Sequence, residues 1–138
     1  MTEARTDLNA SLKAVRLFNT GEGDCTFELG RIPTSQPIQV NFFFAQTHID
    51  PYQKVAHPAP RLQYVVTLKG KLRFKVTNGD TFIIEPGILL LAEDITGPGH
   101  TWELVEGDEW QRLYIAFEEG TNTQFIPEIG RASCRERV

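Results

Sequence analysis

Three side chains in the middle of the chain have the types and the spacing of a metal site: His57, Gln63 and His100. Gln63 follows His57 within a short Pro-rich segment, and His100 closes a later run of strand-like segments broken by Gly and Pro. If these strands close into a small barrel, two imidazoles and one amide oxygen meet at one opening. We therefore predict a metal site whose three protein ligands are all neutral.

The absence of a carboxylate from this set decides which metal it favours. Mg²⁺, Ca²⁺ and Mn²⁺ prefer anionic oxygen shells, and an iron triad of two histidines and one carboxylate would be incomplete. Copper heads the affinity order of divalent ions and suits imidazole, so we rank copper first, with iron, nickel and zinc as alternatives. Three protein ligands leave a position open for substrate or an oxygen species. The alternative is that Gln63 and His100 only line a barrel mouth and bind no metal.

Acidic residues and a further histidine are candidates for a supporting role. Glu93 and Asp94 precede His100, where they could accept a hydrogen bond from an imidazole N–H or transfer a proton; as loop acids, they could equally stabilise the turn. His48 ends a Phe-rich segment and could reach the same opening as a further ligand, although a surface position is the alternative.

Aromatic residues and one arginine are candidates for contact with a substrate. Trp102 shares a strand face with the last histidine and could line the pocket, and Tyr52 and Tyr64 could stack on a sugar ring. Core burial is the alternative for all three. Arg61 shares a strand face with Gln63 and could reach an anionic group of a substrate, with a surface or interface position as the alternative.

Hydrophobic alternation and turn signals predict an all-β protein. Leu72, Phe74 and Val76 alternate with basic residues, and Asn78-Gly79 is a hairpin signal. Turns are also expected at 69–70 and 107–109. The segments expected as strands are 12–18 (alternatively a short helical turn), 25–32, 38–49, 62–68, 71–76, 81–85, 88–93, 100–106 and 110–119.

Residues 38–117 resemble the cupin superfamily. Of the first cupin motif, His57 matches the first histidine and Gly70 the closing glycine, while Gln63 stands in place of the usual glutamate and Ala59 in place of the second histidine. His100 matches the histidine of the second motif, whose turns are supplied by Gly79, Pro86 and Gly87. The resemblance implies a double-stranded β-helix, or jelly-roll barrel, and a homodimer paired through strands such as 38–45.

The resemblance also implies a function. This variant of the motif is similar to compact copper-dependent cupins that cleave cellulose oxidatively, so we expect a copper oxidoreductase acting on a carbohydrate or other small molecule. The alternatives are a non-redox sugar isomerase, epimerase or lyase with Zn, Ni or Fe, and a non-catalytic small-molecule-binding domain. The metal that the purified protein holds, or the lack of one, distinguishes these three functions.

Composition and charge limit the remaining possibilities. The chain has 138 residues and a formal charge of −4 without a basic stripe, so a nucleic-acid partner is not expected. No apolar run has the length of a membrane span, and no secretory signal is visible, which favours a cytoplasmic protein or an exported one whose signal was removed. We expect a loose segment at 1–11, one domain at 12–127, and a tail at 128–138 that we interpret as translated sequencing adapter.

Overall fold

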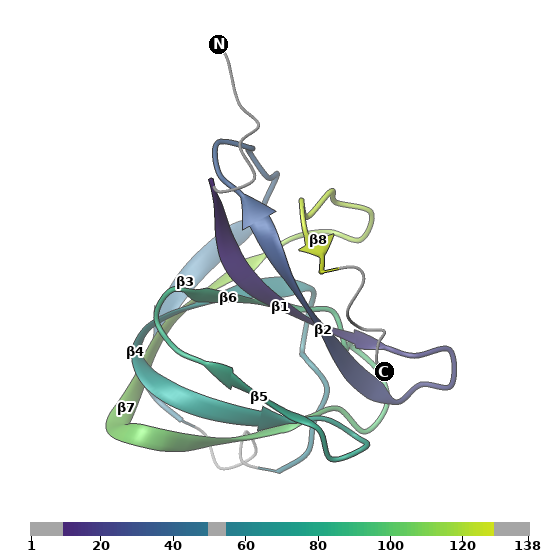
Figure 1. Ribbon diagram of the computed structural model, residues 1–138, viewed down its shortest axis with the longest axis vertical. Coiled ribbons are helices and arrows are strands. Elements are labelled where there is room, and N and C mark those ends of the chain that lie inside the picture. Colours follow the sequence, from purple (N-terminus) through teal and green to yellow (C-terminus); the bar gives the residue numbers. More distant parts are fainter. Residues whose placement is uncertain (1–9, 50–54, 129–138) are drawn as a thin grey trace.

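The computed structural model describes residues 10–49 and 55–128, which form strands and no helix (Figure 1). These strands make one mixed sheet in the order β3-β7-β4-β6-β1-β2-β8, with β5 paired to β4. The all-β prediction is confirmed, whereas hydrogen bonds between the described strands do not close the sheet. The strands are β1 (Ser11–Asn19), β2 (Cys25–Pro33), β3 (Phe42–Gln46), β4 (Gln63–Lys75), β5 (Thr81–Ile84), β6 (Ile88–Ala92), β7 (Thr101–Ala116) and β8 (Ile126–Pro127).

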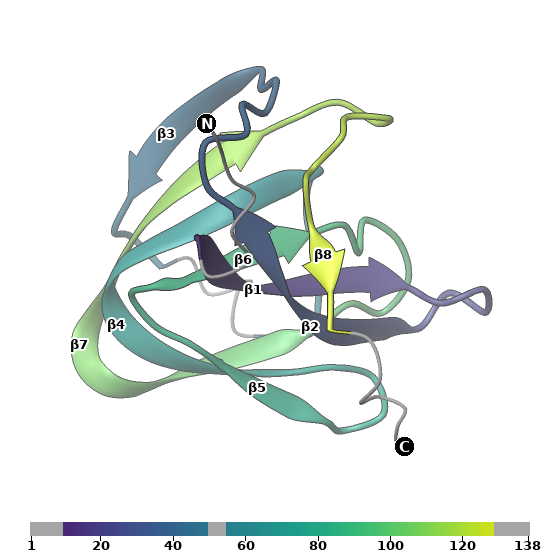
Figure 2. The ribbon, with the colours of Figure 1, turned by 45° about the horizontal axis from the view of Figure 1, so that its top comes forward.

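The sheet curls around a common interior, although its ends do not pair. In Figures 1 and 2, β4, β5, β6 and β7 wrap around one side, and the long β1–β2 ribbon crosses the other. β1 joins β6 in parallel, with Val15 opposite Leu90, and pairs with β2 in antiparallel fashion along its length. The segment 12–18 is therefore a strand and not a helical turn. β3 and β8 lie at the two ends of the strand order.

β4 and β7 are continuous where the sequence predicts turns at 69–70 and 107–109. Those predictions are wrong because both strands bend together and stay paired: Lys69 lies opposite Gln111, and Lys71 opposite Glu106, with the register shifted between them. Gly70 has φ +113°, and a Cβ there would lie 2.8 Å from the carbonyl oxygen of Glu109. The turn signals thus mark a bulged bend in a paired ribbon.

Two further segments differ from expectation. Of the long strand expected at 38–49, only Phe42–Gln46 forms a strand, and the two-residue strand β8, beside Gly30 and Arg31, was not predicted. The hairpin at Asn78-Gly79 is confirmed: Gly79 has φ +95°, and the Val76 N–H donates to the Asp80 carbonyl at 3.0 Å.

Apolar side chains cover both faces of the sheet. Leu72, Phe74 and Val76 are buried and Arg73 and Lys75 are exposed, which confirms the alternation predicted for this strand. The larger cluster fills the concave interior, and a smaller one packs on the opposite face. The described residues contain no helix that is long and apolar enough to cross a membrane.

Candidate metal centre

The three predicted ligands line one cavity of about 160 Å³. His57 and His100 form a β-bridge outside the strands, in which each backbone N–H donates to the other's carbonyl, at 3.1 Å and 3.0 Å. Gln63 is the first residue of β4 and only 3% exposed. Residues far apart in sequence are therefore brought together as the spacing predicts, while metal binding itself stays a prediction.

The two imidazole rings lie at a separation typical of two ligands of a single ion. Their centroids are 5.1 Å apart and their planes are inclined by 50°. With metal–nitrogen bonds of about 2.0–2.1 Å, two imidazoles bound at right or tetrahedral angles have centroids roughly 4.4–5.1 Å apart. The separation of the His57 and His100 rings is therefore compatible with one transition-metal ion between them.

Asp94 fixes the orientation of His100 from behind the cavity. Its Oδ2 lies 2.6 Å from His100 Nδ1, and the carboxylate is fully buried. Nδ1–H therefore donates to Asp94, which leaves the lone pair on Nε2, and Nε2 has no hydrogen-bond partner among the described residues. His57 Nδ1 lies 2.8 Å from the Val55 carbonyl, so its lone pair is also on Nε2. Imidazoles that bind metals commonly donate their second N–H in this way.

A second group of potential ligands overlaps the first. The donor atoms of Cys25, Asp94 and His100 all lie within 4.8 Å of one another, so this buried cluster could also hold a metal ion. The Cys25 thiol lies 3.3 Å from Asp94 Oδ2, and Asp94 Oδ1 is buried without a described partner. Burial and then the charge of Asp94 raise the pKa of the Cys25 thiol, which disfavours the thiolate that a metal would need. Sequence reasoning missed Cys25, because no motif spacing links it to the other two.

The other predicted acid, Glu93, lies outside the cavity. Its Oε1 accepts from Arg16 Nε at 2.5 Å, and Arg16 also pairs with Glu28 at 2.7 Å. Successive residues of an extended chain point to opposite sides, so only one of two adjacent acids can face the histidine. The structure therefore brings Asp94, and not Glu93, to the site.

The predicted aromatic contacts divide between cavity and core. Trp102 lines the cavity, 7% exposed. Tyr64 packs against Phe117 on the opposite face and donates its hydroxyl to the Thr123 carbonyl, and burial raises its pKa to about 12. His48 is exposed and does not line the cavity, and Tyr52 lies outside the described residues.

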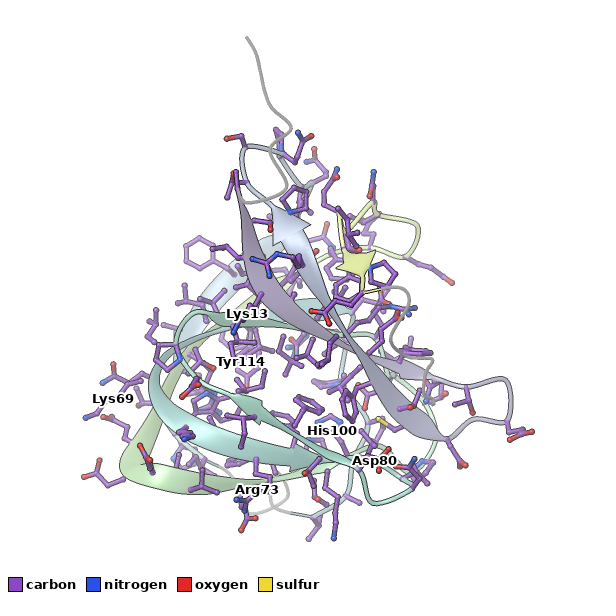
Figure 3. The ribbon with its side chains drawn as sticks, in the orientation of Figure 1. Lys13, Lys69, Arg73, Asp80, His100 and Tyr114 are labelled. Carbon is purple, nitrogen blue, oxygen red and sulfur yellow. The ribbon has the colours of Figure 1, made fainter. Side chains whose placement is uncertain are left out.

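Two arginines complete the cavity wall. Arg61 Nη1 donates to Gln63 Oε1 at 2.7 Å, which uses one of the two lone pairs of the proposed amide ligand. Arg112 is 1% exposed, and the sequence does not single it out, because it looks like one of two adjacent polar residues in the strand expected at 110–119. Figure 3 places His100 within the space that the strands enclose, whereas Lys69 and Arg73 project from the outer side.

Comparison of the chain with protein-family models, curated proteins and solved structures finds no match.

Proposed function

We propose that the protein is a cupin-like metal protein in which His57 and His100, through Nε2, and Gln63, through Oε1, hold one transition-metal ion. The observation that carries this proposal is that two imidazoles line one small cavity, with a buried carboxylate behind one of them. The neutral donor set favours copper over metals that need anionic oxygen ligands.

We further propose that the protein is an oxidoreductase acting on a polysaccharide such as cellulose, a substrate supported by the motif resemblance. Copper, when bound, would supply one-electron redox chemistry and an open coordination position. The surrounding residues would exclude bulk water and position the substrate: Trp102, Trp110 and Tyr114 line the cavity. Because an engineered cavity of about 150 Å³ holds benzene, this one of about 160 Å³ accommodates a single ring-sized group.

The metal proposal is tested by copper titration of the chelator-stripped protein, followed by electron paramagnetic resonance. We expect one copper per chain with nitrogen ligation, and at least about tenfold weaker binding in His57→Ala and His100→Ala. His48→Ala is the matched control, because this histidine is exposed and does not line the cavity. Unchanged affinity in both cavity variants would refute the site. Copper-loaded protein that releases no oxidised sugars from cellulose, with reductant and peroxide supplied, would refute the substrate.

The ion could instead be bound by the buried group of Cys25, Asp94 and His100. In favour of this placement, Asp94 Oδ1 is buried and has no hydrogen-bond partner among the described residues. Replacing Cys25 by Ala separates the two placements. If the ion lies in the cavity, copper affinity stays within about threefold of the parent protein. If the ion lies in the buried group, affinity falls strongly, because a ligand is lost, and copper–thiolate absorption is absent from the variant.

A further inference from the structure

The cavity carries positive charge, although the protein as a whole has a net charge of −4. Arg61 and Arg112 line it, and no Asp or Glu does so among the described residues. Asp94 is the carboxylate behind the wall, and its Oδ2 is already shared by His100 and Cys25. Two arginine side chains therefore line one small cavity, and no described carboxylate lines it with them.

Arg112 is the more unusual of the two, because it is a buried charge that pairs with no carboxylate among the described residues. Its Nε donates to the Tyr114 hydroxyl at 3.0 Å, Nη1 to the Trp110 carbonyl at 2.9 Å, and Nη2 to the His48 carbonyl at 3.0 Å. These acceptors are neutral, and they use three of the five guanidinium N–H groups. No described carboxylate forms a salt bridge with it. The guanidinium carbon also lies 4.4 Å from the ring centroid of Trp110 and 5.4 Å from that of Tyr114, so cation–π contacts offset part of the cost of burial. An anion in the cavity would stabilise this buried charge further.

Arg61 lies on the same wall and is only partly buried. Its Nη1 donates to Gln63, and its guanidinium lies 5.6 Å from the ring centroid of Phe44. Like Arg112, it forms no salt bridge with a described carboxylate. Phe44 in turn packs against Tyr114, whose hydroxyl accepts from Arg112, so each arginine contacts one member of the same aromatic pair.

We propose that this cavity binds a small organic carboxylate, held by Arg61 and Arg112. A guanidinium presents a planar fork of N–H groups that matches a carboxylate. Most of the other lining residues are aromatic or aliphatic, which suits an organic body rather than a hydrated inorganic anion. The aromatic residues are Phe44, Phe74, Trp102, Trp110 and Tyr114. The carboxylate would be a further ligand of the cavity, besides the ion and the neutral polysaccharide of the proposed function. Any part it plays in the chemistry rests on that function, but its binding does not need the metal.

Benzoate and its neutral counterpart benzamide test the proposal, because both are ring-sized and differ in charge. Binding is measured by calorimetry on the metal-free protein, and fluorescence of Trp102 and Trp110 reports whether the cavity is occupied. We expect one benzoate per chain and at least about tenfold weaker binding of benzamide. Arg61→Gln should weaken benzoate binding by about tenfold or more. Arg73→Gln is the matched control, since Arg73 projects from the outer side and pairs with Glu103 (Figure 3).

Equal affinities for benzoate and benzamide, an unchanged affinity in Arg61→Gln, or no benzoate binding would each overturn the inference. Inorganic phosphate that binds more tightly than benzoate would overturn the organic part. Arg112→Lys gives a second test: it keeps the charge but loses the planar fork, so benzoate binding should weaken while the thermal midpoint shows whether the fold persists. These measurements use metal-free protein. The carboxylate inference can therefore hold even if the protein binds no copper, and the copper site can hold even if benzoate does not bind.

Discussion

Replacement of Asp94 by Asn should weaken copper binding about tenfold. The carboxylate oxygen lies 2.6 Å from His100 Nδ1, so this is a short hydrogen bond to a buried, charged acceptor. Asn keeps an acceptor at the same place but loses the charge. Hydrogen bonds to charged groups contribute about 1.5–3 kcal/mol and neutral ones about 0.5–1.5 kcal/mol. The difference, about 1–1.5 kcal/mol, corresponds to roughly a five- to fifteenfold change in affinity.

The assay is a competition titration of copper against a chelator of known affinity, on parent and variant proteins of verified thermal stability. Glu93→Gln is the matched control, because it removes the neighbouring negative charge, which pairs with Arg16 away from the cavity. We expect Glu93→Gln to leave copper affinity within about twofold. Equal losses of copper affinity in the two variants would mean that the overall negative charge, and not the orientation of His100, controls binding. An unchanged copper affinity in Asp94→Asn would refute the reasoning.

Three further predictions concern the fold and its assembly. Gly70→Ala should destabilise the protein by about 1–3 kcal/mol in denaturant unfolding, because a Cβ at positive φ would meet the Glu109 carbonyl. Trp110→Phe should cost about 1–3 kcal/mol in the same assay, because the indole N–H donates to the buried Thr67 hydroxyl at 3.0 Å. Phe43, on the edge strand β3, is 67% exposed, so we expect a homodimer that covers it. Sedimentation analysis should then show a dimer for the parent protein and a monomer for Phe43→Lys. A monomeric parent protein at micromolar concentration would contradict this.

Local sequence patterns predicted most of the strands and the proximity of His57 and His100, but they did not predict that β4 and β7 bend without ending. The alternation of Leu72 and Phe74 identifies the buried face of β4, because side chains of a strand alternate between faces. Gly70 and Gly107 look like turn residues, since positive φ is common to turns and bulges. Only the pairing partner, which lies far along the chain, decides whether the strand reverses or bends.

The residues missed at the site depend on contacts between distant segments. Cys25 reaches Asp94 because the start of β2 lies against the loop after β6, and the two residues are 69 positions apart. Arg112 stands in a strand whose neighbouring residues are mixed in polarity, so its 1% exposure follows from how β7 curls around the interior. Spacing within one segment carries no information about either contact.

The charge of the cavity couples metal and anion. A divalent ion held by His57 and His100 would share a small space with Arg61 and Arg112, and like charges repel strongly where water is scarce. A bound carboxylate reduces this repulsion, so saturating benzoate should tighten copper binding, and copper should tighten benzoate binding by the same factor, about fivefold or more. Benzamide should leave copper affinity unchanged. Arg61→Gln should tighten copper binding without benzoate, because it removes a positive charge. If benzoate instead displaces copper, the carboxylate occupies the ion's position, and the two sites are one.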